Sequence, residues 1–233
     1  MNNSIDEITN SYSIFQELPF EKLIQDFQEL NLIYNCAIKE VYTKLEVLSE
    51  EFKVKRQRNP IEYMKTRVKS IQSTIEKLSR KGYETSIESI KTNLHDMAGI
   101  RVICSYVDDI YAIADMLISQ NDITLIEMKD YIKNPKPNGY RSLHIIVQVP
   151  VFFSDHTELV KAEVQIRTIA MDFWASLEHK LHYKSNVAKC SLNIKNDLKE
   201  CADIIAQTDM KMQSIHEIVE KLEDDVELRK IKL

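Results

Sequence analysis

Apolar side chains recur at three- and four-residue steps near the start of the chain, which is the spacing of one face of an α-helix. The pattern begins at Pro19, a residue suited to a first helical turn, and continues to about Phe52. A basic segment, 53–59, follows and ends at Pro60, which predicts a turn. The apolar face comprises Leu23, Phe27, Leu30, Tyr34, Ile38, Val41, Leu45 and Leu48.

The hydrophobic pattern changes after this turn. Residues 61–67 are compatible with a helix or a strand. A strand is favoured, because Ser70 is then placed to cap a helix over 71–81. Gly82 stands just past the end of that helix, where a left-handed backbone conformation often closes the last turn.

Short apolar runs and helical segments alternate through the middle of the chain. A run of about four to eight residues rich in β-branched side chains is typical of a strand, whereas a period near 3.6 is typical of a helix. Asp108 and Asp109 stand where one helix should begin, a position that favours negative charge. These patterns predict strands over 100–106, 123–128 and 143–149, and helices over 107–120, 169–183 and 191–233.

The segment 159–168 alternates between polar and apolar residues, as a strand with one buried face does. Glu163, Gln165 and Arg167 therefore share one face, and the valine and isoleucine between them share the other. A face of this kind is compatible with an ordinary solvent-exposed sheet surface. It becomes a candidate site only when other chemistry-bearing residues converge on it.

The element order predicts an α/β fold of the α+β kind, with a mixed β-sheet flanked by helices at both ends. A chain of 233 residues, 44% of them hydrophobic, is long enough for one such globular domain with additional helices. The expected boundaries are an N-terminal helical segment over 1–52, a central domain over 53–185 and a C-terminal helical segment over 186–233.

The charge balance limits the classes of partner. The formal net charge is −5, from 31 basic and 36 acidic residues, which argues against nucleic acid as the main partner. The N-terminus has no secretory pattern, and no apolar run approaches the length of a membrane span. The cysteines form no CxxC pair and indicate free thiols in a reducing compartment, so we expect a cytoplasmic protein.

Two carboxylates are placed to meet at neighbouring strands. Asp96 comes just before the strand predicted from residue 100, and Glu163 lies on the strand over 159–168. Mg²⁺ prefers hard oxygen ligands and keeps open positions for phosphate groups. Asp96 and Glu163 are therefore candidate Mg²⁺ ligands.

Cations suited to phosphate lie near the start of the helix over 71–81. Lys69 is close to its N-terminus, where free backbone N–H groups favour an anion, and Ser73 and Lys77 follow on one helix face. A stripe of this kind is also common on ordinary surface helices. The segment 133–139, stiffened by its prolines, presents Tyr140. It is likewise compatible with an ordinary surface loop or with a binding site.

Tyr140 and its neighbours have the chemistry of a purine site. An aromatic ring can stack on a base while the amide of Asn138 hydrogen-bonds its edge. Lys129 adds positive charge nearby, together with Lys133 and Lys136. A charged surface loop with a half-buried tyrosine would show the same pattern.

The strings HDMAGIR (95–101), NGYRSLH (138–144) and EVQIRT (163–168) closely resemble the synthetase motifs of the RelA/SpoT family. TRVKSIQS (66–73) and WASLEH (174–179) extend the resemblance over residues 55–185. The order and spacing of the strings make the set highly specific. The short chain with helical ends resembles the single-domain members, the small alarmone synthetases of the RelP and RelQ type.

The resemblance implies a nucleotidyltransferase-like sheet on which ATP and a guanosine nucleotide lie side by side. It implies that Asp96 and Glu163 hold Mg²⁺, with Glu163 also able to accept the proton of the attacking 3′-hydroxyl. It further implies an adenine sandwich, contacts to the ATP phosphates and a guanine site. By the resemblance, Arg67 and Arg101 hold the adenine, and Lys69, Ser73 and Lys77 contact the ATP phosphates. Tyr140 and Asn138 form the guanine site, with Lys129, His144 and Gln165 nearby.

The activity implied is transfer of pyrophosphate from ATP to the 3′-hydroxyl of GDP or GTP, in a homotetramer. Such a transfer requires in-line positioning and neutralised phosphate charge, which agrees with the residue types found. The chain reads Glu127-Met-Lys-Asp130 where longer synthases carry Arg-x-Lys-Asp or Glu-x-Asp-Asp. The lysine fits use of one metal ion, and Glu127 leaves the preference between GDP and GTP open.

Two other functions use the same residues. One keeps the chemistry but changes the acceptor to a tRNA 3′ end or an adenosine nucleotide, and the acidic net charge speaks against tRNA. The other is a nucleotide-binding regulator without activity, which intact metal-ligand positions disfavour. Hydrolase activity is not expected, because His95-Asp96 has no further histidines placed to complete a hydrolase metal site.

Overall fold

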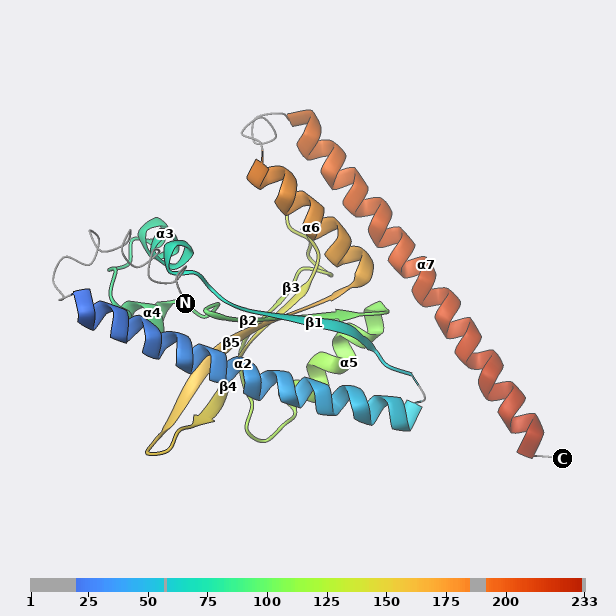
Figure 1. The fold of residues 1–233 in the computed structure, drawn as a ribbon. Coiled ribbons are helices and arrows are strands. Elements are labelled where there is room, and N and C mark those ends of the chain that lie inside the picture. Colours follow the sequence, from blue (N-terminus) through green and yellow to red (C-terminus); the bar gives the residue numbers. More distant parts are fainter. Residues whose placement is uncertain (1–19, 57, 185–191, 232–233) are drawn as a thin grey trace.

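The computed structural model describes residues 20–56, 58–184 and 192–231. Pro19, Cys190 and the expected boundary at 185/186 lie outside the described residues. The elements in chain order are α2 (Phe20–Arg56), β1 (Ile61–Val68), α3 (Ile71–Lys81), α4 (Ile87–Asn93), β2 (Ala98–Cys104), α5 (Val107–Ile118), β3 (Thr124–Asp130), β4 (Leu143–Phe152), β5 (Thr157–Thr168), α6 (Ile169–Lys184) and α7 (Leu192–Ile231) (Figure 1).

The five strands form one mixed sheet in the order β1-β2-β5-β4-β3. β2 and β5 run parallel at its centre, and the other neighbours are antiparallel. The crossover between β2 and β5 contains α5, β3 and β4, so segments distant in sequence meet at the central pair. This confirms the predicted mixed sheet.

The apolar face of the sheet is covered by α2 and α5. α2 contacts β1, β2, β4 and β5, and α5 contacts β2, β4 and β5. Val164 and Ile166 are fully buried on this face, whereas Glu163 and Gln165 on the other face are half-buried. All predicted apolar positions of α2 are buried except Leu23, whose side chain is not among those described.

The capping residues of α3 behave as predicted. The Ser70 hydroxyl accepts a hydrogen bond from the Ser73 backbone N–H, which satisfies one free donor of the first turn. Gly82 has a φ of 69°, and its N–H group donates to carbonyl oxygens of the last turn. The long helix at the start differs from the prediction, because the segment expected as a turn from Lys53 stays helical to Arg56.

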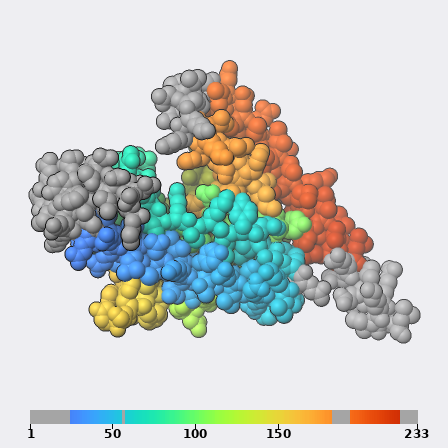
Figure 2. Space-filling model, in the orientation of Figure 1, coloured from blue at the N-terminus to red at the C-terminus, as the bar shows by residue number. Residues whose placement is uncertain are grey.

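α6 and α7 lie at one end of the sheet and pack on each other. They form a ridge along one side of the molecule, orange to red in Figure 2. α7 has 40 residues and runs well past the sheet (Figure 1). Among the described helices, none has an apolar stretch that could cross a membrane.

Candidate functional site

The polar face of the sheet collects six of the predicted residues in two rows across the strands. Cross-strand partners point to the same face of a sheet, so register alone brings them together. One row contains Arg67 (β1), Gly99 (β2) and Glu163 (β5), and the next contains Lys65, Arg101, Gln165, His144 and Lys129. A cavity of about 220 Å³ lies over these rows, lined by Lys65, Thr66, Arg67, Gly99, Ile100, Arg101, Glu163 and Gln165.

The side chain of Arg67 packs against Gly99 on the neighbouring strand. A Cβ atom built on Gly99 would lie 3.4 Å from Arg67 Cγ and 3.6 Å from Arg67 Nε, which is ordinary van der Waals contact. This geometry places its guanidinium group at the cavity that Arg101 also lines.

Asp96 is held by two lysines at the start of β2. Its Oδ2 atom accepts from Lys69 Nζ at 2.8 Å and lies 2.7 Å from Lys77 Nζ. Burial raises the pKa of Asp96, but the hydrogen bonds and positive charges of Lys69 and Lys77 outweigh burial and lower the pKa to about 2. The structure thus brings together three predicted residues, with both lysines bound to the carboxylate.

Glu163 has both carboxylate oxygens in hydrogen bonds. Oε1 accepts from His144 Nδ1 at 3.1 Å, and Oε2 accepts from Gln165 Nε2 at 2.8 Å. Burial and the charge of Asp96 raise the pKa of Glu163, but the hydrogen bond and charge of His144 and the hydrogen bond from Gln165 leave it below its usual value. Glu163 is therefore ionised at neutral pH, and the charges of the two candidate metal ligands act on each other.

Tyr140 continues this network toward Arg167. Its hydroxyl lies 2.8 Å from His144 Nε2 and accepts from Arg167 Nη2 at 2.7 Å. Burial raises the pKa of Tyr140, so the hydroxyl keeps its proton at neutral pH. His144 bridges the Tyr140 hydroxyl and Glu163 through its two ring nitrogens. Lys136 Nζ lies 4.8 Å from the centre of the Tyr140 ring.

Asp172 is a residue of this network that the sequence analysis missed. It lies in the first turn of α6, is 4% exposed, and accepts from Arg101 and Arg167, each at 3.2 Å. Tyr63 also donates to it, at 3.0 Å. The sequence does show an acidic residue shortly after the polar strand. Nothing in the sequence indicates that two arginines converge on this residue.

The predicted residues Asn138, Ser73 and Lys129 hydrogen-bond neither Asp96 nor Glu163. The Asn138 amide nitrogen donates to Glu178, and its oxygen accepts from the Tyr140 backbone. Ser73 is exposed, and Lys129 pairs with Glu127 at 2.8 Å on the same strand. These residues border the polar face without contacting its central carboxylates.

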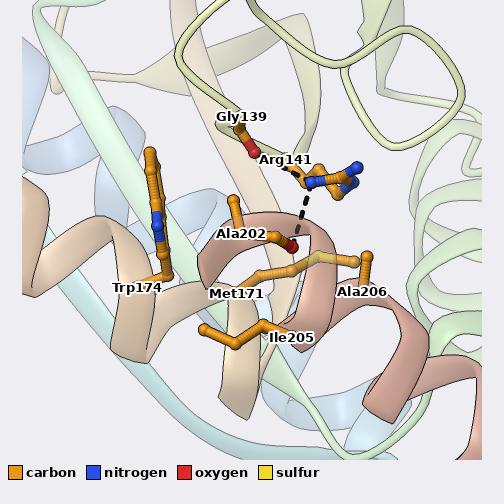
Figure 3. A pocket seen from close by; sticks show the side chains of 7 residues that line it. All are labelled: Gly139, Arg141, Met171, Trp174, Ala202, Ile205 and Ala206. Carbon is orange, nitrogen blue, oxygen red and sulfur yellow. Dashed lines mark hydrogen bonds between the residues drawn. The ribbon is translucent and has the colours of Figure 1, made fainter. Parts of the chain in front are cut away.

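The loop that presents Tyr140 rests on α7 (Figure 3). Arg141 donates from Nη1 to the carbonyl oxygens of Gly139 and Ala202, at 3.0 and 3.2 Å, and from Nη2 to Asp203 at 2.9 Å. Gly139 has a φ of 91°, and a Cβ atom built on it would lie 2.6 Å from Ala202 Cβ. This close approach and the positive φ require glycine, and the partner on α7 was not predicted from the sequence.

The donor set fits a hard divalent cation. Asp96 Oδ1 is buried and has no hydrogen-bond partner among the described residues, so it is a free acceptor. In the same described part of the chain, no three His, Cys, Asp or Glu side chains converge on one point. Two carboxylates with open positions are the donor set of an ion that also binds phosphate oxygens.

Comparisons with known proteins agree with these motifs. Residues 66–188 match the region found in RelA/SpoT proteins. The chain is 46% identical over 200 residues to the GTP pyrophosphokinase YwaC of Bacillus subtilis, covering 85% of this chain and 94% of that protein.

Two solved structures from Bacillus subtilis share the fold. Small alarmone synthetase 2 has a TM-score of 0.74 and 45% identity, over 82% of this chain and 98% of that chain. Small alarmone synthetase 1 bound to its product pppGpp has a TM-score of 0.76 and 33% identity, over 83% and 97%. With its motifs on one polar sheet face, the chain belongs to the RelA/SpoT family.

Proposed function

We propose that this chain is a GTP pyrophosphokinase that transfers pyrophosphate from ATP to the 3′-hydroxyl of GDP or GTP. The products are AMP and ppGpp or pppGpp. The observation that carries the proposal is the placement of Glu163 on the polar face of β5, and of Asp96 with Lys69 and Lys77 just before the neighbouring strand β2, at the family's motif positions. The relatives named above are GTP pyrophosphokinases or small alarmone synthetases, which supports the same activity.

Asp96 and Glu163 are the residues that would hold Mg²⁺. The free Oδ1 of Asp96 and the ionised Glu163 supply two oxygen ligands. When bound there, Mg²⁺ would neutralise charge that develops on the transferring phosphates. Lys69 and Lys77 balance the charge of Asp96 in the protein alone, so the carboxylate is ionised and oriented before any ligand arrives.

The donor nucleotide is assigned to the cavity over β1 and β2. Arg67 and Arg101 line it from neighbouring strands, and planar guanidinium groups can hold an adenine ring between them. Lys69, Lys77 and the exposed Ser73 hydroxyl are next along the same edge, toward Asp96. We assign them to the ATP phosphates, which these cations and this hydroxyl would contact once ATP is bound.

The acceptor nucleotide is assigned to the side of β4 and the loop before it. Tyr140 would stack on guanine, with Asn138 and Gln165 hydrogen-bonding nearby, and Lys129 and His144 would approach its phosphates. Glu163 would accept the proton of the attacking 3′-hydroxyl. Its depressed pKa keeps it ionised, and its hydrogen bonds to His144 and Gln165 fix its orientation.

Product identification by mass spectrometry tests the function. The purified chain with ATP, MgCl₂ and GDP or GTP should yield AMP and a guanosine nucleotide that carries a 3′-pyrophosphate. Parallel reactions with ADP and with deacylated tRNA should give no labelled product from [γ-³²P]ATP. Transfer to one of these acceptors instead would replace the proposed substrate, and binding of nucleotides without any transfer would mean a regulator.

We propose that the chain assembles as a homotetramer through α6 and α7. Ile169, Phe173, Leu177 and Leu181 follow at four-residue steps on α6, and each is more than 40% exposed. The exposed apolar residues of α7 are Ile204, Met210, Met212, Ile215, Ile218, Val219 and Leu222. Apolar faces this extensive are best covered by further copies of the chain. Light scattering should give four times the mass of one chain, and a monomer would rule this assembly out.

A further inference from the structure

Asp172 stands where the donor and acceptor sides of the site join. It belongs to α6, the helix that directly follows β5. Its carboxylate is 4% exposed, which makes an unpaired negative charge at this position very costly. It is paired with two guanidinium groups, those of Arg101 and Arg167, and both donate to the same oxygen, Oδ1.

Arg101 connects Asp172 to the donor side. Its guanidinium donates from Nη1 at 3.2 Å and is one-third exposed at the cavity assigned to adenine. Its Nε atom is buried and has no hydrogen-bond partner among the described residues. Asp172 is therefore the only carboxylate that the described structure pairs with Arg101, and it determines how the guanidinium lies over the sheet.

Arg167 connects Asp172 to the acceptor side by two routes. Its Nη2 atom donates to Tyr140 Oη at 2.7 Å and to Gln165 Oε1 at 2.5 Å. Tyr140 continues through His144 to one oxygen of Glu163, and Gln165 bonds the other oxygen directly. The arginine is 3% exposed, and burial lowers its pKa, so the charge of Asp172 is needed to stabilise it.

We propose that Asp172 is a positioning residue that sets the donor-side Arg101 directly and the acceptor-side network through Arg167. It touches no substrate itself. Because one carboxylate oxygen anchors both arginines, loss of its charge is expected to weaken binding on both sides of the site. The inference rests on the proposed function for the identity of the two ligands.

Asp172→Asn tests this role, because the amide keeps the size of the side chain and removes its charge. Binding of AMPCPP, an ATP analogue with a methylene between its α and β phosphorus atoms, is measured by calorimetry. The Kd for AMPCPP and the KM for GDP are each expected to rise roughly tenfold, the effect of losing a charged hydrogen bond. Unchanged values for both ligands in a folded Asp172→Asn protein would overturn the proposal.

Asp109→Asn is the matched control. Asp109 is also a buried aspartate in the first turn of a helix, and it is paired with an arginine, Arg58, at 2.7 Å. It lies outside the network of the site. The variant should lower the Tm but leave the AMPCPP Kd and the KM for GDP within about twofold of the wild type. An equal rise in both variants would mean that Asp172 acts only through stability.

Tyr140→Phe keeps the test informative if Asp172→Asn does not fold. This variant removes only the hydroxyl that joins Arg167 to His144. It should raise the AMPCPP Kd about threefold although Tyr140 belongs to the acceptor side, because the hydroxyl lies on the route through Arg167. No change in AMPCPP binding would contradict the linkage. A wild-type protein that binds AMPCPP but makes no product would instead refute the proposed function.

Discussion

Arg67, Gly99 and Glu163 are positioned by strand pairing, whereas Tyr140 is positioned by a loop that rests on α7. On the side assigned to the donor, strand pairing thus fixes the backbones of Arg67 and Arg101 relative to each other. The acceptor side depends on Gly139 and Arg141 contacting a helix far along the chain. The difference implies that changes to α7 affect acceptor binding selectively.

The largest expected effect is on the two carboxylates that both sides share. Asp96→Ala and Glu163→Ala should each lower the rate of transfer by about 10²–10³-fold, comparable with loss of a main transition-state stabiliser. Steady-state formation of AMP at saturating nucleotide measures this. Glu158→Gln is the control, because Glu158 lies on the same strand and pairs with Lys91 away from the site. Near-normal rates in both alanine variants would remove these residues from the chemistry.

The next effect separates the two sides directly. Tyr140→Ala should weaken binding of GDP roughly tenfold to a hundredfold, the contribution of one base stacked on an aromatic ring. Calorimetry with GDP measures the Kd, and Tyr140→Trp, which keeps a stacking surface, should recover most of the affinity. GDP that binds equally well to the alanine variant would contradict stacking on Tyr140.

A smaller effect tests the support of the loop by α7. Gly139→Ala places a methyl group 2.6 Å from Ala202 Cβ and forces alanine to a positive φ, so the KM for GDP should rise roughly tenfold. The KM for ATP should rise by no more than the roughly threefold expected for loss of the Tyr140 hydroxyl, because strand pairing holds the backbone of Arg67 and Arg101.

Ala202→Gly supplies the control for this loop. It removes the methyl group that Gly139→Ala would contact, so the double variant should regain part of the affinity for GDP. It should not regain all of it, because alanine at position 139 still has to adopt an unfavourable positive φ. A parallel rise in the KM values for ATP and GDP would show that α7 supports both sides, and the contrast drawn above would fail.

The last effect concerns the stability that the charge of Asp96 contributes, which is lost only at acidic pH. Its pKa is about 2 in the folded protein, below the ordinary value of 3.8, because Lys69 and Lys77 overcome the effect of burial. The resulting stability is fully present above pH 3.8 and is lost as the pH falls through about 2. The wild type should therefore lose about 2 kcal/mol more than Asp96→Asn between pH 5 and pH 2. Urea unfolding measures this, and parallel losses would contradict the pairing.

Most secondary structure was predictable because the periodic patterns of apolar residues extend over enough residues to distinguish helices from strands. The strand at β1, the caps of α3 and the alternation in β5 are confirmed, with the caps at the expected residues. α4 was missed because its seven residues make only two turns of mostly polar sequence. The ends of β2 and α2 differ by a few residues, as hydrogen bonding to neighbours decides where an element stops.

The chemistry of the site was also largely present in the sequence, because its residue types are those that phosphate and metal require. The hydrogen-bond and ion-pair partners of those residues could not be predicted from the sequence. Lys69 and Lys77 were expected near phosphates and are seen on Asp96, and Asn138 is seen on Glu178. In the protein alone, each buried or half-buried charge takes the nearest opposite charge or hydrogen-bond partner.

The sequence by itself determined the fold class, the family and the candidate residues for the chemistry, since periodicity and motif spacing are local properties of the chain. Only the tertiary structure decided that Asp172 joins Arg101 to Arg167, and that Gly139 meets Ala202 on α7. These contacts connect positions separated by up to 71 residues. Their existence depends on how the helices pack against the sheet, which no local pattern encodes.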